Sequence, residues 1–376
     1  MRQVPLAEAK PGMVLARYIM NSSGKILLAP DMVITNAYIR KLANLSIATI
    51  FVKDPDHPDI TLPEYISVQT QQRAMAILAD TLGKIATENT FVPSVVSSIA
   101  SDIVEEVLMH TSLNIFLTGI QTHDDDTLAH SLNCSIYSAI LARLAGFSVA
   151  QIKEITCGAL LHDAGKMWID KAILNKPGRL TAAEFALVQQ HPERGFDALR
   201  ARRWELSSLV AHMAWQHHER VSGQGYPRGL AGDAILPYAR LLAITDVYEA
   251  VTVDRPYRRA MAPVDIYKTI SAGLGTDFDA EYGQIFLSKL AIYLPGMRVH
   301  LNTGEMAIVV SVPAEQPHRP VVRLLAYPDG SPVTPPREVA LATSPQLMIS
   351  EIIPDSWPAP KANVRLVHQH RKLSID

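Results

Sequence analysis

The sequence predicts a mainly α-helical protein in which a helical bundle is flanked by a small N-terminal α+β module and a small C-terminal β module. Three observations support this fold class. Apolar residues recur at three- and four-residue steps from about residue 65 to residue 293, the period of helices with one buried face. Short apolar runs separated by turn residues precede this stretch, and alternating apolar runs follow it.

Composition narrows the class of protein. The chain has 376 residues, of which 48% are hydrophobic and 19% are charged, with a net charge of -2. These values are typical of a globular protein and give no basic field for polymeric nucleic acid or an anionic membrane. The two cysteines, Cys134 and Cys157, lie in apolar helical stretches and are expected to be small buried residues rather than a disulfide framework. The chain has no apolar signal core and no apolar run near the ~18 residues of a membrane span, so we expect a cytoplasmic protein.

The first module is expected over residues 1–58. Its predicted elements are strands at 13–20, 26–28 and 47–52 and a helix at 36–45, with a turn at 21–25. Either a packing cap or a regulatory module fits this pattern. The breaker-rich stretch 54–59 ends it, and His57 is expected to face solvent there.

A helical connector is expected over residues 59–125, and the helical bundle over residues 126–293. In the connector, Val95, Ile99, Ile103 and Val107 form the expected buried stripe, and the layer offers a surface for a homodimer. In the bundle, glycine and proline make residues 219–232 a loop, after which helix resumes from Leu236 through Tyr248.

The last module is expected over residues 294–355, followed by a solvated basic tail over residues 356–376. Its predicted strands are Arg298–Leu301, Met306–Val312 and Val321–Leu325. Turn residues at 302–304 and 329–330 separate these strands.

Histidines and carboxylates recur through the bundle at steps close to the length of one helix. Asp126 and His130 are four residues apart and face the same side of a helix. The later members of the series are His162 with Asp163, then His191, His217 with His218, and Asp246; successive steps are 32, 29, 26 and 28 residues. A bundle whose helices each send ligands inward gives this spacing. Nitrogen and oxygen ligands of this number predict two or three divalent ions rather than a structural zinc–cysteine site.

Several other side chains are placed to meet an anionic substrate. Lys166 follows the His-Asp pair, and Arg255 and Arg258 follow Asp246; guanidinium groups bind phosphate oxygens in pairs. Tyr226 lies in the loop after His218, between flexible glycines and Pro227, where its ring can wedge or hydrogen-bond.

These motifs resemble the HD-GYP family, a subgroup of HD-superfamily metal phosphohydrolases that degrade cyclic di-GMP. The matching segments are HDAGK at 162–166, KPGRL at 176–180, QHPERG at 190–195, HHERVSGQGYP at 217–227 and ITDVYEAVTVDRPYR at 244–258. Many HD domains share the His-Asp pair, but few share HHE, GYP and RPYR in this order. The resemblance covers about half of the chain.

The resemblance implies a role for each matching residue. Asp163 would bridge two ions; His130, His162 and Asp246 would complete one site, and His191, His217 and His218 the other. Asp126 falls where some members carry a longer glutamate that holds a third ion, so either two or three ions fit. Lys166, Arg255 and Arg258 match phosphate-holding positions. Ser222 and Glu249 stand where aspartate is usual, and neither is a ligand position.

The implied activity is hydrolysis of cyclic di-GMP to linear pGpG, with GMP as the product of a further cleavage, by a metal-bridged hydroxide. Asp163 and Lys166 would be the catalytic residues, Tyr226 would help to bind substrate, and iron or manganese suits the ligands. Two alternatives stay open: action on another cyclic dinucleotide, and a non-catalytic sensor of metal or cyclic di-GMP that signals to partners through its end modules.

Overall fold

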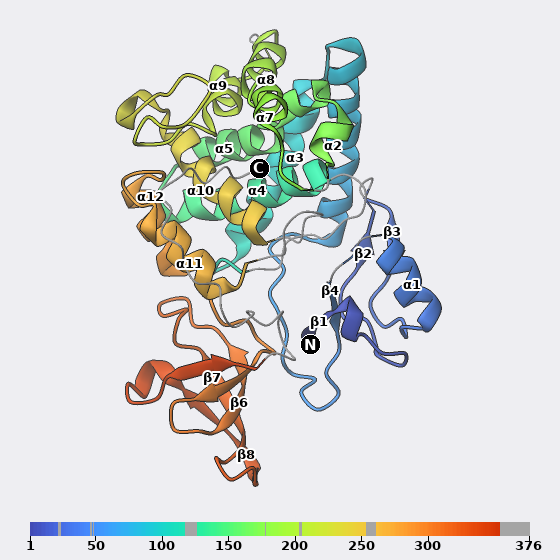
Figure 1. The fold of residues 1–376 in the computed structure, drawn as a ribbon, viewed down its shortest axis with the longest axis vertical. Coiled ribbons are helices and arrows are strands. Elements are labelled where there is room, and N and C mark those ends of the chain that lie inside the picture. The colour runs from blue at the N-terminus through green and yellow to red at the C-terminus, as the bar shows by residue number, and fades with distance from the viewer. Residues whose placement is uncertain are drawn as a thin grey trace.

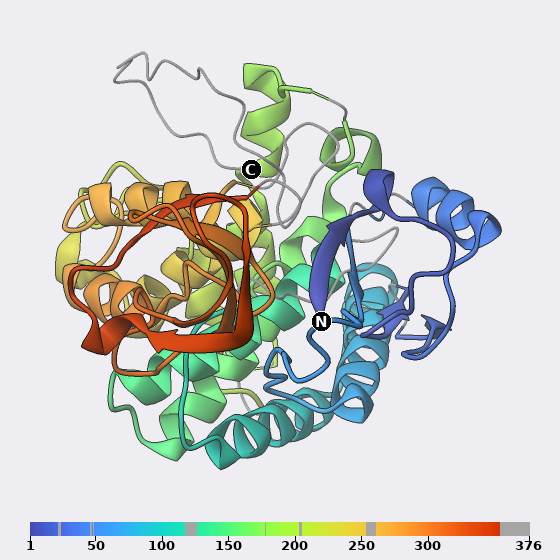
Figure 2. The same ribbon diagram turned by 90° about the horizontal axis from the view of Figure 1, so that it is seen from below.

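A computed structural model describes residues 1–21, 24–45, 47, 49–116, 126–176, 178–202, 205–252 and 261–353, without the side chain of Asp126. Helices form its largest part, a small strand-and-helix module flanks them near the N-terminus, and a sheet lies below them (Figure 1). The predicted fold class is therefore confirmed. Seen from below, the C-terminal sheet and the N-terminal module lie on opposite sides (Figure 2). Within the described ranges, no helix is long and apolar enough to cross a membrane.

The N-terminal module has its own small core. Its elements are β1 (Arg2–Pro5), η1 (Leu6–Glu8), β2 (Ile19–Met20), β3 (Ile26–Leu28), α1 (Asn36–Asn44) and β4 (Thr49–Val52). Strand β1 pairs with β4, and β2 pairs with β3, both antiparallel. Leu15, Ile34 and Ile50 belong to a cluster that is separate from the core of the helices. The strand expected over residues 13–20 is wrong in extent, since only Val14, Leu15 and the two residues of β2 make strand contacts.

Two long helices, α2 (Val68–Glu88) and α3 (Pro93–Met109), form the connecting layer. Asn89 ends α2 in a left-handed conformation, and Pro93 begins α3 at the position where its missing N–H costs nothing. The buried stripe of α3 is Val96, Ile99, Ile103 and Val107. Val95, which we expected in this stripe, is wrong: it is 43% exposed, because it lies one residue off the buried face.

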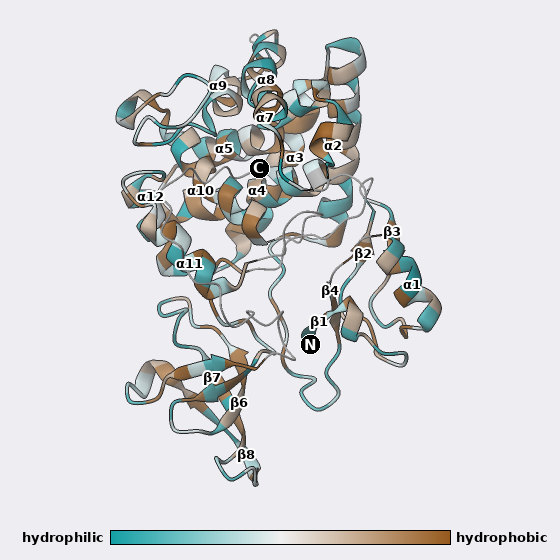
Figure 3. Ribbon diagram, viewed as in Figure 1, coloured by the Kyte–Doolittle hydropathy of each residue, from teal (hydrophilic) through white to brown (hydrophobic). Residues whose placement is uncertain are grey.

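The bundle is built from helices that bury almost every side chain near its centre. Its elements are α4 (Asp126–Leu144), α5 (Val149–Leu161), η2 (Ala164–Trp168), α6 (Lys171–Leu174), α7 (Ala182–Val188), α8 (His191–Arg200), α9 (Ser208–Gln216), η3 (Gly232–Ala234), α10 (Pro237–Thr252), α11 (Pro263–Ala272) and α12 (Ala280–Lys289). Hydrophobic and hydrophilic residues alternate along the outer helices (Figure 3). Helix α10 instead buries an unbroken run from Leu241 to Val251 and continues past Tyr248, where we expected it to end. Carboxylates within that run therefore need partners.

The C-terminal sheet has five antiparallel strands in the order β8-β7-β6-β5-β9. They are β5 (Arg298–Leu301), β6 (Met306–Ser311), β7 (Val321–Ala326), β8 (Pro332–Ala340) and β9 (Ile349–Ile352), and η4 (Leu341–Thr343) precedes β9. The sequence did not predict β8 and β9. Prolines at 332, 335 and 336 argue against a central strand, but β8 is an edge strand, where a missing N–H is tolerated.

The segment before α2 joins this sheet to the rest of the chain. Arg323 of β7 forms an ion pair with Asp59, and its Nη1 lies 3.5 Å from Nδ1 of His57. The expectation of a solvated His57 is wrong, because this contact leaves the ring 8% exposed. The predicted tail over residues 356–376 lies outside the described residues.

Candidate metal centre

Five helical segments bring the histidine and aspartate series together, three of them at a helix end. His130 lies in α4, His162 and Asp163 lie between α5 and η2, His191 begins α8, His217 and His218 follow α9, and Asp246 lies in α10. Each of these side chains is buried. Local sequence explains the placement: Ser148 and Gln151 form a capping box that starts α5 so that it ends at His162, and Pro192 lies in the first turn of α8 beside His191.

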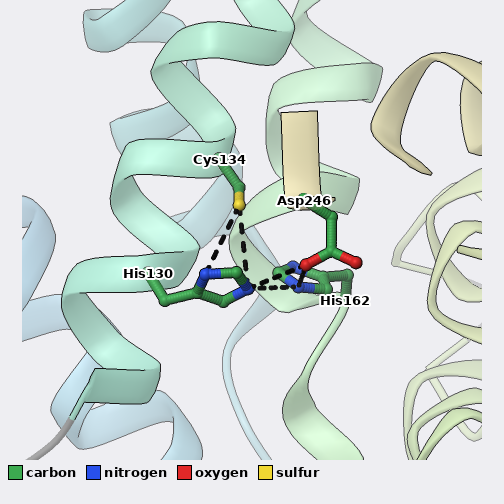
Figure 4. Close-up of side chains that lie close together, drawn as sticks. All are labelled: His130, Cys134, His162 and Asp246. Carbon is green, nitrogen blue, oxygen red and sulfur yellow. Dashed lines mark hydrogen bonds and ion pairs between the residues drawn. The ribbon is translucent and has the colours of Figure 1, made fainter. Parts of the chain in front are cut away.

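One group contains His130, Cys134, His162 and Asp246 (Figure 4). The Nε2 atom of His130 lies 3.1 Å from Oδ1 of Asp246 and 3.2 Å from Nε2 of His162. Three donor atoms from helices that are distant in sequence therefore converge on one point.

A second group contains His191, His217 and His218, and Asp163 lies between the two groups. The Nε2 atoms of His191 and His217 are 3.2 Å apart and lie 3.4 Å and 3.7 Å from Oδ1 of Asp163. The other oxygen of Asp163, Oδ2, lies 3.4 Å from Nε2 of His162 and 3.6 Å from Nε2 of His130. Each oxygen of one carboxylate thus faces a different pair of imidazoles, as a bridging ligand requires.

Backbone carbonyls fix the orientation of three imidazoles. Nδ1 of His162, His191 and His217 donates to the carbonyl three residues earlier, at 2.7, 2.7 and 2.9 Å respectively. A carbonyl only accepts, so the proton is on Nδ1 and the lone pair on Nε2 faces the centre. Two such lone pairs 3.2 Å apart repel each other unless a cation lies beside both.

The electrostatics of the centre also favour cations. Burial alone would raise the pKa of Asp163, but His162 and Lys166 outweigh it and hold that pKa well below its usual range. Burial and the adjacent imidazoles hold the pKa of His217 and of His218 well below the usual value. Apart from the ion pair between Oδ2 and Lys166, neither oxygen of Asp163 accepts a hydrogen bond from the described part of the chain. Ionised carboxylates and neutral imidazoles are the forms that bind divalent metal, so the donor set fits a centre with more than one ion.

A carboxylate that the sequence did not mark for a role supports this centre. Glu249 is buried; its Oε2 accepts from Nδ1 of His130, and its Oε1 accepts from Nδ2 of Asn133 at 3.0 Å. It lies one helical turn beyond Asp246 and so faces the same side of α10. That spacing was the available signal, and we treated the position only as a departure from the family pattern.

Cys134 was expected to be a small buried residue, and it lies closer to the centre than that description implied. Its Sγ is 3.8 Å from Nδ1 and 3.7 Å from Nε2 of His130, so it is almost equally far from both ring nitrogens and is not directed at the Nε2 lone pair alone (Figure 4). Burial raises the pKa of this thiol to about 12, and Sγ points its proton at the Thr245 carbonyl, 3.9 Å away. Cys134 therefore packs against the imidazole of His130 as a neutral thiol.

Lys166 and Tyr226 lie at the edge of the centre. Nζ of Lys166 is 2.8 Å from Oδ2 of Asp163. The Tyr226 ring stacks on His218, with centroids 4.6 Å apart. A side chain at Gly225 would come within 2.4 Å of the His218 carbonyl, so this glycine permits the close turn. Arg255, Arg258 and the side chain of Asp126 lie outside the described residues.

Comparison with known proteins identifies two parts of the chain. Residues 96–282 match the family described as HD domain, and residues 298–356 match the one described as KOW domain associated with HD domain.

Individual relatives match over the helical region. Cyclic di-GMP phosphodiesterase PA4108 of Pseudomonas aeruginosa is 37% identical over 215 residues, which make up 56% of this chain and 51% of that protein. The cyclic di-GMP phosphodiesterase response regulator RpfG of Xanthomonas campestris pv. campestris is 36% identical over 145 residues, or 39% of this chain and 38% of that one. The 3'3'-cGAMP-specific phosphodiesterase 3 of Vibrio cholerae is 40% identical over 157 residues, covering 41% of this chain and 33% of its own. The chain therefore spans about half or less of the length of these curated relatives.

A solved structure, Bd1817, an HDG"Y"P protein from Bdellovibrio bacteriovorus, covers 76% of this chain and 97% of its own at a TM-score of 0.47 and 14% identity. The expectation drawn from the HDAGK and HHERVSGQGYP motifs is confirmed by the match of residues 96–282, and this region of the chain belongs to the HD domain family.

Proposed function

We propose that this chain hydrolyses a phosphodiester bond of a cyclic dinucleotide, with cyclic di-GMP as the substrate. The observation that carries the proposal is the placement of Asp163, whose two oxygens face two different histidine pairs. A bridging carboxylate between two groups of nitrogen ligands is the arrangement of two-metal phosphohydrolase sites. The relative in P. aeruginosa named as a cyclic di-GMP phosphodiesterase, 37% identical over part of its length, supports the substrate class.

The ligand groups divide into two sets that share Asp163. His130, His162 and Asp246 would hold one ion, and His191, His217 and His218 the other; Asp126 would add a ligand for a third. Iron or manganese suits imidazole and carboxylate donors. When bound, these ions supply the positive charge that polarises a phosphoryl group and lowers the pKa of water toward neutrality.

The remaining residues would hold the substrate and move protons. The ammonium group of Lys166 lies beside Asp163, where it can offset charge on a phosphoryl oxygen or give a proton to the leaving 3′ oxygen. Arg255 and Arg258 would hold phosphate oxygens in pairs. The ring of Tyr226, stacked on His218, offers an aromatic wall near the bond that is cleaved.

A second substrate follows from the relatives. The V. cholerae protein that is 40% identical over 157 residues is named for 3'3'-cGAMP, which differs from cyclic di-GMP in one base. The metal-facing residues would contact the phosphate, which both nucleotides share, so these residues would not discriminate between the two. Turnover of both nucleotides under the same conditions separates these readings.

The test is hydrolysis by protein purified without oxygen, loaded with iron or manganese, and analysed for metal per chain. We expect cyclic di-GMP to yield pGpG, and GMP if a further cleavage follows. Asp163→Asn keeps the shape of the bridging carboxylate but removes its charge, so activity should fall on the order of 100-fold or more. Asp279→Asn, a matched change at the cap of α12, should keep normal activity. Intact substrate with fully loaded protein would refute the proposal, and binding without cleavage would indicate the sensor.

A further inference from the structure

A cavity between the N-terminal module and the helices has the features of a second ligand site. Its volume is about 100 Å³, and it opens to solvent at one side. The N-terminal module contributes Tyr18 and Phe51 to its lining, and the helical side contributes Tyr65 and Tyr137. Clefts between modules lined by aromatic rings and a few polar groups are typical small-molecule sites, and aromatic walls favour a planar ring.

The charged groups in the lining of this cavity are a guanidinium and a carboxylate. The guanidinium of Arg17 is largely buried over the Phe51 ring, 4.9 Å from its centroid, and Nη2 donates to the Pro63 carbonyl at 3.0 Å. Its buried Nε donates no hydrogen bond to any described residue, although Oε1 of Glu64 lies 3.4 Å away. The Glu64 side chain is 48% exposed, and an exposed ion pair of this kind contributes little, so a ligand can compete for the carboxylate. The cavity therefore presents a cationic donor, whose Nε makes no hydrogen bond among the described residues, next to an anionic acceptor.

We propose that this cavity binds a guanine-type base, so that a guanine nucleotide regulates the metal centre. Guanine carries the acceptors O6 and N7, which suit a guanidinium, and donors on the adjoining edge, which suit a carboxylate. Adenine has a donor in place of O6 and lacks the adjoining donors. A bound base would enter between the aromatic rings, with its sugar and phosphate at the open side. The choice of guanine rests on the proposed function, because pGpG and GMP are its products.

The cavity is connected to the metal centre through α4. Asn133 lines the cavity and donates to Glu249, which in turn accepts from Nδ1 of His130. A ligand that moves Asn133 changes the support of one imidazole in the centre. Occupancy of the cavity should therefore change metal affinity, without any contact between the base and a metal ligand.

The experiment is calorimetric titration of the full chain, freed of metal by chelation, with GMP and with AMP as the control nucleotide. We expect one GMP per chain and much weaker AMP binding. Glu64→Gln should weaken GMP binding roughly tenfold or more, because a charged acceptor is lost. Tyr18→Ala should also weaken GMP binding, because it removes one of the aromatic rings that line the cavity. The matched control is Glu105→Gln, which removes an exposed carboxylate that pairs with Lys153 on α3 and α5, and it should bind as the wild type does.

Several outcomes would overturn the proposal. They are no GMP binding, equal binding of AMP, or equal GMP binding by wild type and Glu64→Gln with a normal melting temperature. Loss of GMP binding in Asp163→Asn but not in Glu64→Gln would assign the nucleotide to the metal centre instead. GMP should also shift manganese affinity by about fivefold or more in the wild type; an unchanged affinity would refute the regulatory role. Hydrolysis of cyclic di-GMP by the wild type tests the proposed function separately, because Glu64 faces none of the metal-binding side chains.

Discussion

Replacing Glu249 by glutamine tests whether this carboxylate, which is not itself an expected metal ligand, supports the centre through its hydrogen bond with His130. The change keeps the size and removes the negative charge. The amide oxygen can still accept from His130, and Asn133 can turn its own oxygen toward the new NH₂ group, so no buried donor need be left alone. The fold should therefore survive, and the effect should come from the weaker acceptor.

The expected magnitude follows from the kind of bond that is lost. A hydrogen bond to a charged group contributes about 1.5–3 kcal/mol and a neutral one about 1 kcal/mol, so the support of His130 weakens by about 1 kcal/mol. A neutral acceptor at Nδ1 also leaves less electron density on Nε2 of His130, so this nitrogen binds a metal ion more weakly. Loss of such partners typically lowers metal affinity about 10–100-fold, or about 1.4–2.8 kcal/mol.

The assay is competition for manganese between the protein and a chromogenic chelator, with the urea denaturation of metal-free protein measured beside it. Glu106→Gln is the matched control, because that carboxylate accepts from Thr70 Oγ1 and from Ser67 Oγ far from the centre. Glu249→Gln should lose metal affinity and Glu106→Gln should not. Equal manganese affinity in wild type and Glu249→Gln, or an equal loss in both variants, would refute the reasoning.

Three further outcomes are expected. Gly165→Ala would place Cβ 1.9 Å from the His191 carbonyl oxygen, so α8 must shift; the melting temperature and manganese affinity should both fall, at a cost of about 1–3 kcal/mol or more. A Gly165→Ala variant that is as stable as the wild type and binds manganese normally would contradict this packing. Gly83→Ala is the contrasting change: its Cβ would meet nothing within 4 Å in an exposed part of α2, so the folded protein should become more stable by about 0.5–1 kcal/mol. The unfolding free energy of metal-free protein should fall as the pH drops from about 6.5 to 5. The pKa values of His217 and His218 are lowered in the folded protein, so these histidines bind protons in this pH range only when the chain is unfolded. The raised pKa of His130 acts in the opposite sense, mainly as the pH rises above that range, and a slope unchanged in His217→Gln would reject the assignment.

Much of the fold was accessible from periodicity, and its errors have identifiable causes. The helix at Asn36–Asn44 and the strands at Arg298–Leu301 and Ile26–Leu28 lie where apolar spacing and turn residues predicted them. Strand β8 was missed because local sequence does not reveal that a strand lies at an edge. The burial of His57 depends on Arg323, a residue far along the chain that sequence spacing does not connect with it.

The candidate centre divides in the same way. Spacing predicted which segments send histidines inward, because the ligands fall one or two to a helical segment of ordinary length. Spacing did not predict that each oxygen of Asp163 faces a different histidine pair, which depends on side-chain rotamers. The contact of Glu249 with Asn133 was equally hidden, since it joins two helices across the core.

The convergence of donors from five distant segments has a consequence for how the chain unfolds. An ion held by His130 and Asp246 would tie together positions more than a hundred residues apart, much as a cross-link does. In the chain-entropy treatment, a covalent closure of about 100 residues removes about 4.7 kcal/mol of disorder from the unfolded chain, which sets the scale for such a tie. Bound metal would therefore act as a reversible cross-link. Its removal should make the helical region open cooperatively and become sensitive to proteases.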